Sequence, residues 1–119
     1  MNAYIYQADF YCETCAIAIR NRLTREGRSP DDPNDETTFD SDQFPKGPIA
    51  DGGGEADTPQ HCSSCGAFLE NPLTTDGQEY VKREVATIEA RDRAVYSGNR
   101  HSMRVTRDWK RFYGYLFAE

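Results

Sequence analysis

The sequence predicts a small α+β fold with a short β element and about three helices. Strand-like and helix-like segments share only 119 residues, so we expect one domain across residues 1–119. Only 37% of the residues are apolar, and a core that small commonly needs a metal or crosslinks. The four cysteines form two Cys-x-x-Cys pairs, Cys12–Cys15 and Cys62–Cys65. Two such pairs have the spacing of a tetrahedral zinc site, so we expect the domain to be stapled by zinc.

The N-terminal segment predicts β structure followed by a helix. Residues 3–6 and Phe10-Tyr11 are rich in aromatic residues and have the character of strands. From Thr14 the apolar spacing becomes helical, and Gly27 is a plausible C-cap. The apolar face of this helix comprises Ala16, Ile19 and Leu23. Cys15 would then lie in the first helical turn, where the helix dipole favours a thiolate.

Residues 28–60 predict an irregular acidic loop. Residues 26–60 carry ten acidic and two basic side chains, so their net charge of −8 exceeds the −6 of the whole chain. The simplest interpretation is a solvated loop that Phe39 and Phe44 pin to the domain. The alternative is an anionic surface, with Asp40 and Asp42 among its carboxylates, that engages a basic partner or imitates the phosphates of DNA.

The second half of the chain predicts a zinc knuckle and two helices. The knuckle is His61-Cys62-Ser63-Ser64-Cys65-Gly66, where Gly66 allows a positive φ, and Phe68-Leu69 has the character of a short strand. We expect Thr75 or Asp76 to cap a helix that ends at residues 97–99, and a last amphipathic segment from about Ser102 to Tyr113. The apolar positions of the first of these helices are Val81, Val85, Ile88 and Val95.

Four thiolates would close the metal site, so the sequence predicts a structural role for zinc and no activation of water. His61 is adjacent to Cys62, but we expect it to support the site without ligating the ion. The alternatives for the cysteines are an unligated core cluster or a thiol redox couple, although no βαβ pattern surrounds either pair. No catalytic motif is present, and we predict that the protein is not an enzyme.

The absence of a signal peptide and of a long apolar run predicts a cytoplasmic protein, in a bacterial cell or a phage-infected host. Thiols stay reduced in that compartment, which favours metal binding over disulfides. We expect no membrane attachment.

The two cysteine pairs resemble the halves of a zinc-ribbon or treble-clef zinc finger. The helix-start pair comes first here, which would be a permuted arrangement. Residues 51–57, His61-Cys62 and residues 68–74 also resemble small uncharacterised proteins of phages and prophages. This second resemblance implies a phage origin and no particular activity.

The C-terminal segment predicts a basic helix face, here named the arginine ridge. Its residues recur at helical spacing and are Arg100, Arg104, Arg107 and Arg111. An apolar stripe runs parallel to the ridge and is expected to pack on the core; its members are Val105, Trp109, Phe112 and Leu116. A solvated face or a partner for the acidic loop is the simplest interpretation of the ridge. Contact with nucleic acid is its leading functional interpretation, against which stands the negative net charge.

The sequence therefore predicts a small non-enzymatic accessory module that zinc stabilises and that binds a protein partner. The alternative is a nucleic-acid-binding zinc finger that uses the arginine ridge, and the second alternative is a thiol redox protein. The partner and the oligomeric state stay open.

Overall fold

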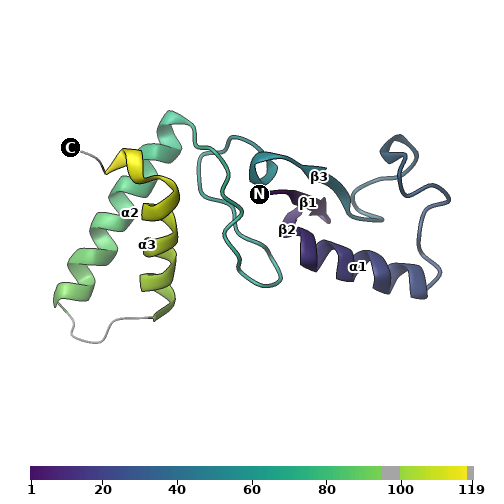
Figure 1. The fold of residues 1–119 in the computed structure, drawn as a ribbon, viewed down its shortest axis with the longest axis horizontal. Helices are drawn as coiled ribbons and strands as arrows, with labels where there is room; N and C mark the ends of the chain where they lie inside the picture. Colours follow the sequence, from purple (N-terminus) through teal and green to yellow (C-terminus); the bar gives the residue numbers. More distant parts are fainter. Residues whose placement is uncertain (95–99, 118–119) are drawn as a thin grey trace. The chain divides into compact units, whose positions relative to one another are not determined.

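The computed structural model describes residues 1–94 and 100–117, and it has the predicted α+β fold (Figure 1). Three α-helices and a three-stranded antiparallel sheet lie within these residues. Contacts divide the chain into two compact units. We name residues 1–54 with 60–71 the N-terminal unit, and residues 55–59 with the chain from Pro72 onward the helical unit. The extent of one domain over residues 1–119 stays a prediction.

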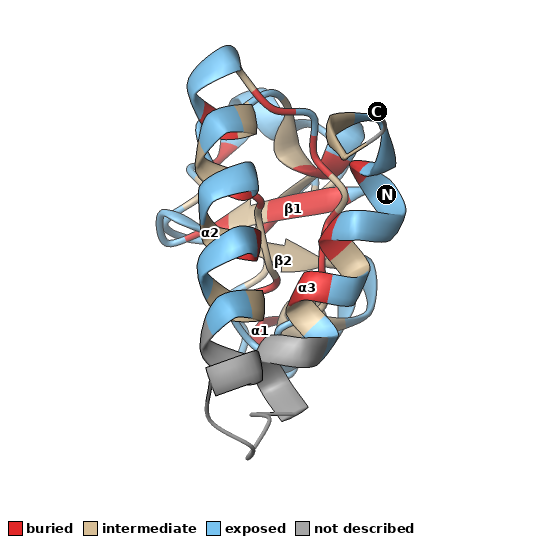
Figure 2. Ribbon diagram, turned by 90° about the vertical axis from the view of Figure 1, so that its left-hand side faces the viewer, coloured by how far each residue is buried: buried red, intermediate tan, exposed pale blue. Residues whose placement is uncertain are grey.

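A hairpin and a helix open the N-terminal unit, as the sequence predicts. Strands β1 (Ala3–Tyr6) and β2 (Asp9–Cys12) pair antiparallel, with Ala3 opposite Cys12. Ala3, Tyr4 and Tyr6 are buried, which makes β1 the central and most covered strand of the sheet (Figure 2). Helix α1 (Glu13–Arg25) follows β2 without a loop, so the hairpin directly positions the start of the helix.

The end of α1 confirms the predicted glycine cap. Gly27 has φ 74°, and its N–H donates to the carbonyl of Thr24 at 3.1 Å. The N–H of Arg28 donates to the carbonyl of Leu23 at 2.8 Å. These two bonds form a Schellman motif, which satisfies the last helical carbonyls and turns the chain away from the helix axis.

The prediction that residues 28–60 form only an irregular loop is wrong, because this segment contains a third strand. Strand β3 (Lys46–Ile49) pairs antiparallel with β1 and lies at the edge of the sheet order β2-β1-β3. Its sequence is Lys-Gly-Pro-Ile, which lacks the alternation typical of strands. An edge strand tolerates a proline such as Pro48, since one side of it needs no ladder hydrogen bonds.

The remainder of the acidic segment is ordered by its own side chains. Phe39 and Phe44 are 8% and 2% exposed and pack edge to face at 5.7 Å, in a cluster with Tyr6 and Leu23. This confirms that they pin the segment to the domain. Asp35 accepts a hydrogen bond from the N–H of Thr37 at 3.2 Å and begins a 3₁₀ turn, Glu36–Thr38. Several carboxylates of the segment therefore have local structural tasks.

The helical unit contains α2 (Thr75–Ala94), α3 (Arg100–Phe112) and the 3₁₀ turn Gly114–Leu116. The N-cap of α2 is Thr74, one residue before the predicted cap, and its hydroxyl accepts from the N–H of Gly77 at 3.1 Å. The expected end of this helix at residues 97–99 and its Val95 lie outside the described residues. Within those residues, no helix is long and apolar enough to cross a membrane.

Helices α2 and α3 pack together, and the buried residues of α3 and just after it differ slightly from the apolar stripe that the sequence predicts. Trp109 is 7% exposed and lies 6.3 Å from the ring of Tyr80 on α2. Tyr113 is fully buried, whereas Phe112 is 39% exposed. The buried residues are thus Thr106 and Trp109 on α3 and Tyr113 directly after it, because Tyr113 takes the core position expected of its neighbour.

Candidate metal centre

All four cysteines lie in the N-terminal unit, where two different local structures carry them. Cys12 is the last residue of β2 and the N-cap of α1, and Cys15 lies in the first turn of that helix, as predicted. Cys62 and Cys65 occupy a tight turn that the chain reaches after β3. The four Sγ atoms all lie within 4.8 Å of one another. The four predicted ligands are therefore brought together.

The sulfur positions fit a single tetrahedral ion. Zinc–sulfur bonds of about 2.3 Å in a regular tetrahedron give sulfur–sulfur separations of about 3.8 Å. The Sγ atoms of Cys12 and Cys65 are 3.7 Å apart. A disulfide would need about 2.05 Å between the two sulfurs, and all four cysteines are free. The residues present thus fit a four-sulfur metal site.

Backbone hydrogen bonds build the knuckle that carries the second pair. The N–H of Cys62 donates to the carbonyl of Ala67 at 2.8 Å, and the N–H of Gly66 donates to the carbonyl of Cys62 at 2.9 Å. Gly66 has φ 79°, a conformation that glycine adopts without strain. The predicted strand at Phe68-Leu69 is reduced to a single antiparallel bridge between His61 and Phe68. The resulting turn aims both sulfurs in one direction.

The knuckle is docked on the hairpin by one hydrogen bond and a small apolar cluster. The N–H of Ser63 donates to the carbonyl of Phe10 at 2.9 Å. Ala3 and Leu69, both fully buried, pack with Cys62, and Phe10 lies against this cluster. These contacts hold the knuckle against the hairpin, so both halves of the site lie in one packed region of the N-terminal unit.

The thiols differ in their tendency to ionise. Burial opposes ionisation of Cys62, but hydrogen bonds from the backbones of Cys12, Cys65 and Ser64 outweigh it and lower the pKa of Cys62 to about 6. Burial, followed by the neighbouring thiols, raises the pKa of Cys15 to about 12. Cys62 is thus the first thiolate of the cluster. A cation is needed to stabilise four thiolates so close together.

His61 is placed beside the site and outside the ligand set. Its Nδ1 lies 3.0 Å from the carbonyl oxygen of Gly66, and its ring lies 5.3 Å from that of Phe68. The cluster of metal-ligating side chains comprises the four cysteines alone among the described residues. The expectation that His61 supports the turn without ligating the ion is consistent with these contacts.

The predicted surface residues lie apart from the metal site along the chain. Asp40 and Asp42 are exposed, and Asp40 accepts a hydrogen bond from the N–H of Asp42 at 3.1 Å. Arg104, Arg107 and Arg111 are also exposed. The side chain of Arg100 lies outside the described part of the chain. The two aspartates belong to the N-terminal unit and the three described arginines to the helical unit.

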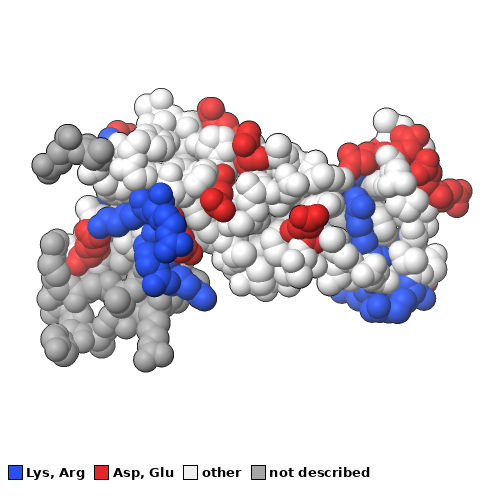
Figure 3. Space-filling view, viewed as in Figure 1, with Lys and Arg blue, Asp and Glu red and all other residues white. Residues whose placement is uncertain are grey.

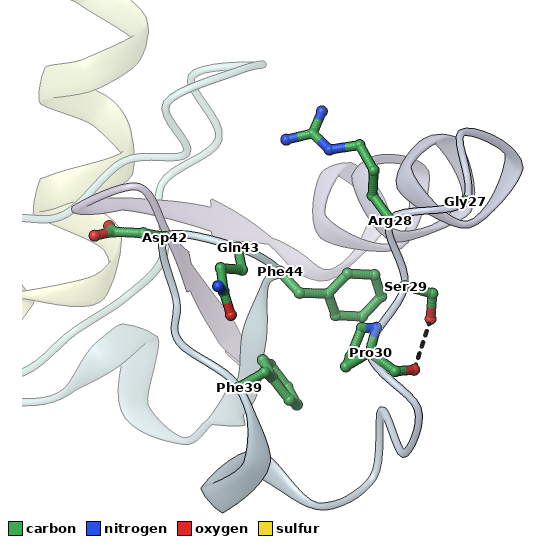
Figure 4. A pocket seen from close by; sticks show the side chains of 8 residues that line it. All are labelled: Gly27, Arg28, Ser29, Pro30, Phe39, Asp42, Gln43 and Phe44. Carbon is green, nitrogen blue, oxygen red and sulfur yellow. Dashed lines mark hydrogen bonds between the residues drawn. The ribbon is translucent and has the colours of Figure 1, made fainter.

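A cavity beside the acidic segment was not predicted from the sequence. It has a volume of about 400 Å³ and opens between the end of α1 and the loop that carries Phe39 (Figure 4). Its lining residues are Gly27, Arg28, Ser29, Pro30, Phe39, Asp42, Gln43 and Phe44. The only sequence signal for this cavity was the presence of Phe39 and Phe44 among the carboxylates, because two apolar rings in such a segment indicate that it folds back on an apolar surface.

Comparisons with protein-family models, with curated proteins and with solved structures find no match to this chain. The functional argument therefore rests on the site and on the surfaces around it.

Proposed function

We propose that this protein is a non-enzymatic accessory module that is stabilised by a structural zinc ion and acts by binding a protein partner. The observation that carries the proposal is the cluster of four cysteine sulfurs within 4.8 Å. A four-sulfur tetrahedral site is typical of zinc or of an iron–sulfur centre, and the single compact cluster favours one zinc ion.

Four sulfur ligands fill every position of a tetrahedral ion. Catalytic zinc sites keep one position open for water or substrate, whereas structural sites are closed. The ion would then join the hairpin and start of α1 to the knuckle. We assign the arrangement to a permuted treble clef, because the pair at the start of a helix precedes the knuckle pair. A module of this kind acts through its surfaces.

The surface that best fits a protein partner in the N-terminal unit is the acidic segment with its cavity. Asp42 and Arg28 both line the cavity together with the rings of Phe39 and Phe44 (Figure 4). Arg28 is paired with Glu26 at 3.3 Å. Exposed carboxylates surround it along the chain; they are Asp31, Asp32, Asp35, Glu36 and Asp40. Negative charge beside a partly apolar hollow suits a basic segment of another protein, which opposite charge would steer into place.

Two measurements test this proposal. Metal analysis of protein purified without added metal should find about one zinc and no free thiol per chain, which would exclude a redox couple. Quantitative affinity capture from the source cell should then recover a partner that an Asp40→Asn/Asp42→Asn variant loses. An Asp76→Asn variant, changed at an exposed position of α2, serves as the control. Retention of the same partners by the Asp40/Asp42 variant would contradict the acidic surface.

The proposal places the module in the cytoplasm, where cysteine ligands stay reduced. It also includes a phage origin, which rests on the resemblance of residues 51–74 to small phage and prophage proteins. The genes that flank this one test the origin directly, since phage structural or replication genes should lie beside it.

A further inference from the structure

The described part of the arginine ridge, Arg104, Arg107 and Arg111, is an exposed basic face of α3. Arg104, Arg107 and Arg111 recur at i, i+3 and i+7, so their Cα atoms lie within about 20–60° of one line on the helix. All three side chains are exposed. With about 1.5 Å of rise per residue, the three cationic groups are spread along about 10 Å of the helix axis. This spread matches an extended anion better than a single small one.

No partner within the described part of the chain neutralises these three arginines. They form none of the ion pairs between described residues, whereas Lys110 on the same helix pairs with Glu89 and Lys82 pairs with Glu79. In Figure 3 basic side chains of the helical unit gather in one connected patch. Among the described residues of the helical unit, the ion pairs with carboxylates are therefore made by Lys82 and Lys110 and not by these three arginines.

The opposite face of α3 fixes the direction of the ridge. Thr106, Trp109 and Tyr113 are each at most 7% exposed, and Trp109 packs against Tyr80 of α2. Rotating the helix to hide the arginines would expose this buried face. The ridge is therefore held outward by the core of the helical unit.

An exposed aromatic residue follows the ridge directly. Tyr115, in the 3₁₀ turn Gly114–Leu116, is 62% exposed, and it comes four residues after Arg111. A large aromatic side chain with that exposure contributes little to a core. Basic grooves or faces accompanied by exposed aromatic rings are typical of surfaces that bind single-stranded nucleic acid, since bases stack on the rings.

We propose that the arginine ridge and Tyr115 form a binding surface for single-stranded nucleic acid, held by its phosphates without sequence preference. Arginine donates to phosphate in a bidentate manner, and three arginines can each contact one phosphate along the strand. Tyr115 stacks with one base at the end of the contact. The negative net charge of the chain is concentrated in residues 26–60, whose −8 compares with +1 for residues 61–119. This surface belongs to the helical unit, whereas the acidic cavity that is proposed to bind protein belongs to the N-terminal unit.

Fluorescence anisotropy of the full-length, metal-loaded protein with a labelled 20-nucleotide single strand tests this surface. Affinity should fall steeply between 50 and 200 mM salt. Three phosphate contacts should contribute about −2 to the slope of log K against the logarithm of the salt concentration. The Arg104→Gln/Arg107→Gln/Arg111→Gln variant should bind at least tenfold more weakly and lose that part of the slope. Tyr115→Ala should weaken binding about tenfold without changing the slope.

The matched control removes three arginine charges at a different helix. Arg22, Arg25 and Arg28 are exposed residues in and just after α1, and their replacement by Gln should leave binding within twofold of the wild type. Circular dichroism and zinc content establish that each variant is folded. If the triple α3 variant fails to fold, Arg107→Glu alone should still weaken binding severalfold.

Three results would overturn the assignment. The first is no binding of the single strand at 50 mM salt, and the second is an equal loss of affinity in the control variant. The third is tighter binding of a duplex or of polyglutamate, which would indicate a different class of partner. None of them affects the proposed protein contact, because that contact depends on residues of the N-terminal unit.

Discussion

The sulfur atoms of Cys12 and Cys65 lie 3.7 Å apart, although the two residues are 53 positions apart in the chain. This separation is close to the edge of about 3.8 Å expected for four sulfurs around one zinc ion. The two cysteines belong to different local structures, a strand end and a knuckle. An ion bound there would crosslink the start of α1 to the knuckle, two parts of the N-terminal unit that are distant in sequence.

Loss of one ligand should release the ion and unfold the N-terminal unit. We expect Cys62→Ser to lose stoichiometric metal, because a structural zinc ion contributes about 10–16 kcal/mol in small peptides, more than the net stability of most domains. Ser63→Ala, an exposed change in the same turn, should keep both metal and fold. Metal analysis and far-ultraviolet circular dichroism measure both effects. A Cys62→Ser protein that retains its metal would contradict the ligand assignment.

Acid should displace the ion. Since the pKa of Cys62 is lowered to about 6 from 9.0, its thiolate predominates above about pH 6; the stability that this shift contributes is fully present above pH 9 and is lost as the pH falls through about 6. Protons therefore compete poorly for this ligand near neutral pH. Cys12 and Cys15, whose pKa values are raised, must give up protons when the ion binds, so metal affinity should decline as the pH falls and do so most steeply below about pH 6. A zinc indicator dye, followed during an acid titration, measures the release. Half-release at or above pH 8 would be inconsistent with the backbone hydrogen bonds at this sulfur.

Two glycines with positive φ should respond differently to alanine. At Gly52, with φ 61°, an added Cβ would lie 2.2 Å from the carbonyl oxygen of Leu69, a backbone atom that cannot move easily. At Gly66, with φ 79°, nothing lies within 4 Å of an added Cβ. We expect Gly66→Ala to cost only about 1–2 kcal/mol of backbone strain and Gly52→Ala clearly more. Thermal unfolding of the metal-loaded variants compares them, and equal losses would count against the close approach.

The cap of α2 gives a test in the helical unit. Thr74 accepts from the N–H of Gly77, so Thr74→Ala should lower the free energy of unfolding by about 0.5–2 kcal/mol. Thr75→Ala, one residue later and exposed, should change it by less than about 0.5 kcal/mol. Chemical denaturation measures both variants. The reverse order would move the cap to the residue that the sequence favours.

Local signals predicted most of the fold near the metal site. The spacing of Cys12 and Cys15 at a helix start and the glycine after Cys65 were sufficient to place all four ligands. Strand β3 was missed because an edge strand containing Pro48 has no alternation, and only its pairing with β1 defines it. The cavity beside Phe39 was also missed, because it depends on how the acidic segment folds back and not on a local sequence pattern.

Helix signals in the second half located both helices, with the cap of α2 one residue and the start of α3 two residues before the predicted positions. The cap of α2 shifted to Thr74 because neighbouring threonines are equivalent in sequence, whereas in the structure the hydroxyl of Thr74 accepts from Gly77 and donates to Asp57. On α3 the periodicity located the helix, but Tyr113 and not Phe112 fills the core. Two adjacent aromatics are equivalent in the sequence pattern, and only the folded structure shows which of them is buried.

X-ray absorption at the zinc edge of protein purified without added metal tests the central claim most directly. The account predicts about one zinc ion per chain with four sulfur ligands at about 2.3 Å and no oxygen or nitrogen ligand. A folded protein without metal, or an ion with one water ligand, would contradict a closed structural site.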